Sequence, residues 1–560
     1  MLIKLKSFIF GFLTFDMKRN IICVLVLAFV GFSSVAQNTK NSVFDNASIE
    51  IKKFNAKQAY NSGDLTTALK LYGEILTAKP QDAEISFHIG ECYQDQGDYD
   101  QAVNNFEKAE KEDPNCDDDL HIKLGQAYLQ LEQVDNALKE METYKKKFAD
   151  SPKKLADNEI EHYIKQCENA KQMMASPVKV TVVNLGETVN TSYDEKSPSI
   201  TADGKTLIFT SQRPLMMSKS GQGEMELIDN VYSSAWDSAK GKWNLSYPVT
   251  GDVNEAYGKT ACSSISPDGT QMFLYKNNNT SALGGDIYVA KKSHAGKWSQ
   301  PVSLGSPVNT SYYEDCACLS PDGSTLYFIS EKPGGYGSAD IYTSSKLSKT
   351  EWAPPVNIGP TINSKYDEGG LSMAPDGKTL FFSSNGDGSM GSYDIFKSVM
   401  SDSGKWRKPV NLGYPINTVS TDVSLTMSAD CKTAYFASNR KGGVGGRDIY
   451  MVDLSQYPIL AADSASMKPT GLSILRGKVT NEKSKPVEEA VVTVMDSNNV
   501  KIAGLKTDAE GMYFITLKAN CKYKIKVSSK GFKSSNVPVK LPSSPVGTFT
   551  MTEDVILQKQ

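Results

Sequence analysis

The side chains of this chain that could do acid–base or metal chemistry are few in kind and widely spaced. Among 560 residues there are four histidines, His88, His121, His162 and His294, and none lies beside another in the sequence. Histidine is the usual proton carrier near neutral pH and a common zinc ligand. We therefore expect no histidine-based active site, no bound metal and no cofactor.

A more regular feature is a series of carboxylates in the middle of the chain. Eight residues before each member of a repeated Asp series stand four carboxylates and one threonine: Glu195, Thr260, Glu314, Glu368 and Asp422. Equivalent positions of a closed ring converge, so Glu195, Glu314, Glu368 and Asp422 are predicted to circle one mouth of a central channel. Such a ring can hold a cation or the basic end of a peptide. The alternative is that each carboxylate accepts hydrogen bonds from a loop of the adjacent repeat.

The elements that must position these carboxylates repeat between residues 178 and 457. Turns begin at a repeated Asp, and successive turns are 54 residues apart after a first interval of 65: Asp203, Asp268, Asp322, Asp376 and Asp430. Each unit contains four short segments rich in β-branched and aromatic residues, separated by Gly, Asp and Pro. Four strands per repeat at fixed spacing predict a β-propeller. The stretch resembles the TolB-type, WD40-like propeller repeats.

The ends of this region predict how many blades the propeller has. The fifth unit stops after Leu454 without its fourth strand, and the segment from Val182 to Gly186, which precedes the first unit, has the missing pattern. Pairing this N-terminal strand into the last blade closes the ring and leaves few exposed strand edges. We therefore expect five blades.

A shorter repeat precedes the propeller, within residues 44–175. The pattern Gly63-Asp64-Leu65, with Ala68, Tyr72 and Pro80, recurs 34 residues later, beginning at Gly97. It resembles the tetratricopeptide repeat, whose paired helices stack into an array with a concave face. Six residues are predicted to point into that face and bind a protein partner: Lys57, Tyr60, Phe87, Glu91, Gln94 and Gln126. The alternative is that they form the solvated face of a spacer.

The last part of the chain is again built of strands. After a linker at residues 458–473, segments such as Gly477-Lys478-Val479 and Tyr513 to Leu517 alternate apolar and polar residues through 474–560. Their order resembles the carboxypeptidase regulatory-like domain, which implies an Ig-like β-sandwich of about seven strands. The predicted fold class is thus a multidomain chain with an α-helical repeat array, a five-bladed propeller and a β-sandwich.

The N-terminus and the composition limit the cellular setting. Residues 1–36 are predicted to be a cleavable signal peptide, because Lys18 and Arg19 precede the apolar run Ile21 to Phe32 and a small-residue cleavage site ends at Ala36. We expect no transmembrane segment after cleavage. A net charge of −3, or −6 without residues 1–36, excludes a strongly basic nucleic-acid-binding chain and makes an anionic membrane a poor partner.

The order of these segments resembles the PorE-type periplasmic envelope proteins of Bacteroidetes, which are associated with type IX secretion. That resemblance implies an exported, periplasmic and non-enzymatic scaffold, linked to the outer membrane, that binds envelope proteins through the helical groove and the propeller rim. The sequence ends at Gln560 without the OmpA-like domain of that family, so direct peptidoglycan binding is not expected. The alternative function is glycan binding through exposed aromatics: Tyr312, Tyr313, Tyr336 and Tyr366.

Overall fold

The computed structural model describes most of the chain, which divides into two compact units, Met1–Leu120 and His121–Gln560. The described residues are 37–149, 157–202, 204–214, 228–254, 259–266, 269–277, 284–293, 296–321, 323–348, 350–429, 431–457, 459–460, 472–507, 510–518, 521–541 and 549–560. Several sequence predictions lie outside them: the signal peptide, most of the linker, His294 and the turn residues Asp203, Asp268, Asp322 and Asp430.

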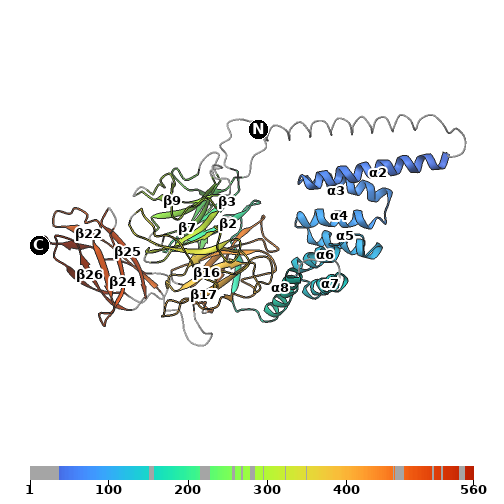
Figure 1. The fold of residues 1–560 in the computed structure, drawn as a ribbon. Helices are drawn as coiled ribbons and strands as arrows, with labels where there is room; N and C mark the ends of the chain where they lie inside the picture. The colour runs from blue at the N-terminus through green and yellow to red at the C-terminus, as the bar shows by residue number, and fades with distance from the viewer. Residues whose placement is uncertain are drawn as a thin grey trace, which may run out of the picture. The chain divides into compact units, whose positions relative to one another are not determined.

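The first unit is helical (Figure 1). Its described helices are α2 (Gln37–Asn61), α3 (Leu65–Ala78), α4 (Ala83–Asp95) and α5 (Tyr99–Glu112). Three of them begin at an aspartate whose side chain accepts a backbone hydrogen bond three residues later: Asp64 from Thr67, Asp82 from Ile85 and Asp98 from Gln101. The repeated Gly-Asp pair therefore marks a helix boundary, since the glycine before two of these caps has a positive φ that other residues rarely adopt.

Close packing between paired helices explains the small residues of the repeat. A Cβ atom added to Gly90 on α4 would lie 2.6 Å from the ring of Phe106 on α5. Ala68, Tyr72 and Ile75 on α3 pack with Ala56 of α2 in one buried cluster. These contacts are those expected of stacked helical repeats.

The second unit begins with helices and continues into strands. Its helices are α6 (Leu120–Gln130), α7 (Val134–Lys147) and α8 (Asp157–Ala175). Ile160, Ile164 and Cys167 form the buried stripe of α8. No helix among the described residues is long and apolar enough to cross a membrane.

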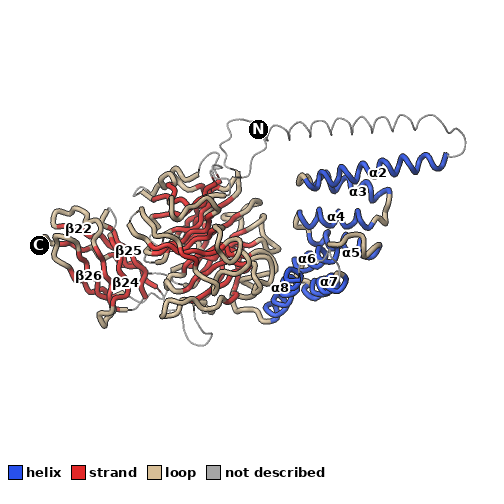
Figure 2. Tube along the Cα trace, viewed as in Figure 1, coloured by secondary structure: helices blue, strands red, loops and turns tan. Residues whose placement is uncertain are grey.

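The blades of the propeller follow (Figures 1 and 2). Among the described residues, four of the five sheets have four strands and the first has five; the strands of each are given from the inner to the outer edge. Blade 1 has β2 (Glu195–Ile200), β3 (Thr206–Ser211), β4 (Asn230–Asp237) and β5 (Lys242–Trp243), with β6 (Tyr247–Pro248) also on β4. Blade 2 has β7 (Lys259–Ile265), β8 (Gln271–Asn277), β9 (Asp286–Lys291) and β10 (Val302–Ser303). Blade 3 has β11 (Glu314–Leu319), β12 (Thr325–Ser330), β13 (Asp340–Ser345) and β14 (Val356–Asn357). Blade 4 has β15 (Glu368–Met373), β16 (Thr379–Ser384), β17 (Asp394–Val399) and β18 (Val410–Asn411).

The fifth blade closes the ring in the predicted way. It contains β19 (Asp422–Met427), β20 (Thr433–Ser438) and β21 (Asp448–Asp453), and its outer strand is β1 (Thr181–Asn184), which comes from before the first blade. Thr181 lies opposite Asp453 in this antiparallel pair. The inner strands β2, β7, β11, β15 and β19 contact one another in turn around the ring.

Short side chains fill the axis of the propeller. Four inner strands have a β-bulge with a positive φ at the equivalent residue: Ser197, Cys316, Gly370 and Ser424. The space they enclose with Ser199, Ser264, Ser372 and Thr426 is about 20 Å³, which is room for about one water molecule. The axis is therefore a packed core with a narrow gap.

The final segment is a sandwich of two sheets around one core. One sheet contains β25 (Met512–Lys518), β22 (Leu472–Asn481), β28 (Phe549–Thr552) and β29 (Val555–Leu557). The other contains β24 (Lys501–Lys506), β23 (Val491–Met495), β26 (Lys522–Ser528) and β27 (Ser535–Lys540), in that order. Leu475 and Val479 from the first sheet pack with Val492, Ile525 and Val527 from the second, all fully buried.

Candidate functional site

The four carboxylates predicted to circle the channel mouth are buried inside their blades. Glu195, Glu314 and Asp422 are 0% exposed and Glu368 is 2% exposed. Each accepts a backbone hydrogen bond from the residue four positions earlier, as Glu195 Oε2 does from Thr191 N at 2.7 Å and Asp422 Oδ2 does from Thr418 N at 2.6 Å. The hydroxyl of that same residue also donates to the carboxylate in all four blades.

The expectation of an open acidic ring is therefore wrong, because these carboxylates already serve as acceptors for the loop that enters each blade. Their alternative interpretation, as acceptors for an inter-blade loop, describes them correctly. The same hydrogen bond over four residues recurs in four blades, so the repeated carboxylate holds the loop that enters its blade.

Cations beside the carboxylates differ between blades. Arg213 Nη2 donates to Glu195 Oε1 at 3.1 Å, and Arg440 Nη2 donates to Asp422 Oδ1 at 2.6 Å. In blade 4 the equivalent position, 54 residues before Arg440, is Gly386. Burial, together with the charge of nearby Asp340, raises the pKa of Glu368 to about 8.

A second repeated residue was missed by the sequence analysis. In every blade an asparagine accepts a hydrogen bond at Oδ1 from the N–H of a strand residue and donates from Nδ2 to the C=O of that same residue. The five asparagines are Asn190, Asn254, Asn309, Asn363 and Asn417. The signal that could have revealed them is a Val-Asn or Ile-Asn dipeptide at the propeller period. These repeated polar residues hold the framework together and are not free for chemistry.

Some polar residues near the starts of the inner strands are not repeated from blade to blade. Lys196 Nζ pairs with Asp229 Oδ2 at 3.0 Å, and the hydroxyl of Tyr313 donates to Asp315 Oδ2 at 3.0 Å. The ring of Tyr313 lies 5.4 Å from that of Tyr275. Burial raises the pKa of Asp315, and the charge of Lys196 opposes this shift.

The aromatic residues considered for glycan binding are mostly engaged within the fold. Tyr313 is held by Asp315 and Tyr275 as described above. Tyr366 stacks at 4.6 Å on His162 and donates to Asp387 Oδ1 at 2.5 Å. Tyr336, at 51% exposure, keeps an accessible ring. The residues do not form the row of open rings that a glycan platform requires.

In the first unit, Lys57 and the second half of α4 supply the polar groups of the predicted peptide groove. Lys57 is exposed, whereas Tyr60, Glu91 and Gln94 are half-buried. Burial and a hydrogen bond to Asp95 raise the pKa of Tyr60. The buried Oε1 atom of Gln94 has no hydrogen-bond partner among the described residues. Helix α4 thus carries the carboxylates of Glu91 and Asp95 and an unused acceptor at the predicted groove positions.

The prediction that Phe87 points into the groove is wrong. Its side chain is 2% exposed, and its ring lies 5.6 Å from the ring of Phe106 on α5. Helix α4 turns this position toward its paired helix, so Phe87 is part of the core and is not available to a partner.

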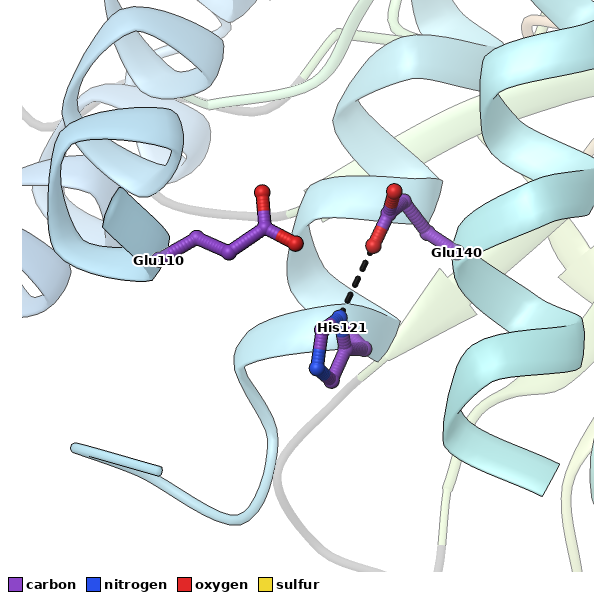
Figure 3. A group of neighbouring side chains, drawn as sticks. All are labelled: Glu110, His121 and Glu140. Carbon is purple, nitrogen blue, oxygen red and sulfur yellow. Dashed lines mark hydrogen bonds and ion pairs between the residues drawn. The ribbon is translucent and has the colours of Figure 1, made fainter. Parts of the chain in front are cut away.

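The second unit holds Gln126, the sixth predicted groove residue, and a buried ion pair. Gln126 is half-buried and hydrogen bonds to the hydroxyl of Tyr163. His121 Nδ1 lies 2.8 Å from Glu140 Oε2, and both side chains are almost fully buried (Figure 3). Burial alone would raise the pKa of Glu140, but hydrogen bonds from His121 and Lys139 hold it below its usual value. The pair ties α6 to α7.

Helix α8 is docked on the fourth blade. Gln166 Nε2 donates to the carbonyl of Gly391 at 2.5 Å, and Asn169 Nδ2 donates to the carbonyls of Asp387 at 2.9 Å and Ser389 at 2.8 Å. Gln130 of α6 adds a 2.9 Å hydrogen bond to the carbonyl of Val419. These hydrogen bonds join the last helices to the propeller rim.

Comparisons with known proteins agree with this architecture. Residues 474–552 match the carboxypeptidase regulatory-like domain, and residues 59–103 and 94–154 match the tetratricopeptide repeat. No curated protein matches the chain.

Similar solved structures each resemble one part of the chain. The TPR2B domain of yeast Sti1 in complex with an Hsp70 peptide is 20% identical over 21% of this chain and 95% of that one, with a TM-score of 0.20. The Yersinia enterocolitica type III secretion chaperone SycD, with a peptide of the translocator YopD, is 18% identical over 22% and 95%, with a TM-score of 0.21. The periplasmic gluconolactonase PpgL of Pseudomonas aeruginosa is 14% identical over 46% and 88%, with a TM-score of 0.27. With the blades and the sandwich described above, the predicted order is confirmed: a tetratricopeptide array, a propeller and an Ig-like sandwich.

Proposed function

We propose that this protein is an exported, non-enzymatic scaffold of the periplasm that binds other cell-envelope proteins, in association with type IX secretion or the outer membrane. Tetratricopeptide repeats fit a protein-interaction role in general. The export, the envelope partners and the secretion link rest on the sequence features and the family resemblance given above. The lack of catalytic activity is part of the same proposal.

The observation that supports this function most is the unsatisfied acceptor of Gln94 at the predicted helical groove. The free acceptor at Gln94 Oε1 lies on the same helix as Glu91, whose carboxylate is 2.8 Å from His88 Nδ1. A buried acceptor without a partner costs free energy unless a ligand satisfies it. An extended peptide supplies backbone N–H donors, and a basic side chain on it would pair with Glu91 or Asp95. We therefore expect the partner segment to be extended and basic.

The propeller supports a scaffold role for a different reason. Its repeated carboxylates and asparagines are all hydrogen bonded within the blades. Chemistry needs groups that are free to exchange protons or bind substrate. The propeller would instead offer its rim loops, together with the last helices docked on blade 4, as a surface for a partner.

Crosslinking mass spectrometry in intact cell envelopes tests the proposal. We expect reproducible protein crosslinks to the first unit of the wild-type chain, and at least a fivefold loss of them in Glu91→Lys combined with Gln94→Ala, because the added positive charge repels a basic segment. Glu74→Lys, at an exposed position of helix α3 in the same unit, is the matched charge control and should keep the crosslinks. Failure to recover any reproducible envelope protein would contradict the scaffold function.

A further inference from the structure

The basic residues of this mildly acidic chain are concentrated in the sandwich. Residues 472–560 contain 14 Lys or Arg and 8 Asp or Glu, which gives a net charge of +6. The whole chain carries −3, so the preceding 471 residues carry −9. The net charge of the whole chain disfavours an anionic partner, but the net charge of the sandwich is positive and favours one.

Five lysines of this segment share one face of one sheet. On β26, Lys522, Lys524 and Lys526 alternate with the buried Tyr523, Ile525 and Val527, so all three point away from the core. Lys540 on β27 lies opposite Lys522, and Met495 of β23 lies between Lys524 and Lys501 of β24. We call this set the lysine face: Lys501, Lys522, Lys524, Lys526 and Lys540. All five are exposed, and none forms an ion pair with a described residue.

This arrangement is unfavourable for the isolated sandwich. Like charges directly opposite one another on neighbouring strands, as at Lys522 and Lys540, destabilise a sheet. Lysines on edge strands are a known protection against aggregation, which accounts for Lys540 and Lys501. It does not account for β26, because β26 lies between β23 and β27. An external anionic surface would relieve the repulsion.

The other residues on this face indicate what kind of anionic surface fits. The outward positions of β23, β24, β26 and β27 carry neither arginine nor an aromatic residue. Protein hot spots favour Arg, Tyr and Trp, whereas glycans and single-stranded nucleic acids are bound by aromatic stacking. The face carries instead exposed aliphatic side chains: Val491 at 39%, Ile502 at 49% and, at the β23–β24 hairpin, Val500 at 60%. Aliphatic residues beside a lysine array suit the headgroup region of a bilayer.

We propose that the lysine face docks the sandwich on an anionic phospholipid bilayer. The lysines lie against the lipid phosphates, and the hairpin with Val500 and Ile502 enters the headgroup layer. Strand geometry spaces Lys522, Lys524 and Lys526 about 7 Å apart along β26, so that several lysines can contact lipid phosphates at once. The proposal is independent of the peptide groove and goes beyond the scaffold function, because it assigns a separate surface to lipid.

Vesicle flotation tests this proposal with the chain from Gln37 onward, which includes every described residue and removes the apolar N-terminal run. At low salt the protein is expected to float with vesicles of phosphatidylcholine containing about 30% phosphatidylglycerol and not with pure phosphatidylcholine. Lys522→Gln, Lys524→Gln and Lys526→Gln together should weaken binding at least about tenfold, because each lysine near such a surface contributes. Binding should also fall as salt rises.

Two controls separate the lysine face from general charge. Lys483→Gln, Lys485→Gln and Lys559→Gln remove three exposed lysines of the sandwich outside the face and should leave binding within about twofold of the wild type. Val500→Ser with Ile502→Ser should weaken binding without changing its salt dependence. A melting curve shows whether the face variant is folded, and its melting temperature should be equal or higher because repulsion is removed.

Three results would each overturn the proposal. The first is equal flotation with and without phosphatidylglycerol. The second is equal loss in the face and control triple variants. The third is tighter binding to soluble polygalacturonate than to the anionic vesicles, which would assign the face to an acidic glycan.

Discussion

Arg440 donates a 2.6 Å hydrogen bond from Nη2 to Oδ1 of Asp422 inside the fifth blade. Arg440 also donates to the carbonyls of Pro415 and Ile416, so its guanidinium fastens the inter-blade loop to the inner strand. The fourth blade has Gly386 at this position, and Glu368 forms no ion pair with a described residue. Glu368 is therefore a buried carboxylate of the ring whose equivalent cation position holds a glycine.

Glu368→Gln should stabilise the protein at high pH. Burial raises the pKa of Glu368 to about 8, from a value of 4.5 in the unfolded chain, so the folded state holds this proton more tightly. The stability that the proton contributes is complete below pH 4.5 and is lost as the pH rises through 8. We expect urea denaturation to show equal stability at pH 5 and, at pH 9, a gain for the variant on the order of 1–3 kcal/mol.

Glu195→Gln is the matched change in a blade that has its arginine. Because Arg213 would lose its carboxylate partner, this variant should be less stable by about 3 kcal/mol at both pH 5 and pH 9. If both variants were destabilised alike at pH 9, Glu368 would not be the uncompensated group described here.

Asn417→Ala should strongly destabilise the propeller. Asn417 accepts from Ile395 N and donates to Ile395 O, both at 2.8 Å, and is fully buried. Removing it leaves two backbone groups unsatisfied, and each costs about 1–3 kcal/mol. Urea denaturation should show a loss of about 2–4 kcal/mol, whereas Asn498→Ala at an exposed turn of the sandwich should change stability by less than about 0.5 kcal/mol. An equally small effect at Asn417 would mean that its two hydrogen bonds to Ile395 do not contribute to stability.

Features set by spacing could be predicted from the sequence, and features set by backbone path could not. The closing strand was predictable because the fifth repeat lacks its last segment and Val182 to Gly186 supplies the pattern, as the pairing of β1 with β21 confirms. The ring position of Glu195 was predictable for the same reason. Its burial was not predicted, because the hydroxyl residue that recurs four positions before each carboxylate (Thr191, Thr310, Ser364 and Thr418) does not by itself show that the loop folds back onto that carboxylate.

In the helical repeats, too, the features set by spacing were predictable and the side-chain orientations were not. The 34-residue offset predicts the paired helices and the close contact at Gly90. The orientation of Phe87 depends on the rotation of α4 against α5, which a repeat pattern determines only to within about one residue, and the prediction failed there. The unpaired Oε1 of Gln94 depends on side-chain contacts and has no signal in the sequence.

Glycine-to-alanine changes in the first unit should have opposite signs at two helical positions. A Cβ atom at Gly90 would lie 2.6 Å from the Phe106 ring, so Gly90→Ala should cost about 1–3 kcal/mol. Gly73 on α3 has no atom within 4 Å of its added Cβ atom, so Gly73→Ala should gain about 0.5–1 kcal/mol from helix propensity. Circular dichroism during thermal unfolding measures both. A stable Gly90→Ala variant would show that α4 and α5 can move apart without cost.

Gln166→Ala should loosen the fourth blade where α8 is docked. Gln166 is 7% exposed and donates to Gly391 O and to Ser389 Oγ, and its loss leaves the Gly391 carbonyl without this donor. A buried carbonyl that loses its partner costs about 1–3 kcal/mol, and the cost should appear locally because α8 can separate while the blade stays folded. Hydrogen exchange of residues 385–392 should accelerate about five- to thirtyfold, whereas Lys165→Ala on the exposed side of α8 should leave it unchanged. Acceleration spread evenly over all five blades would show that the contact stabilises the whole propeller and is not a local dock.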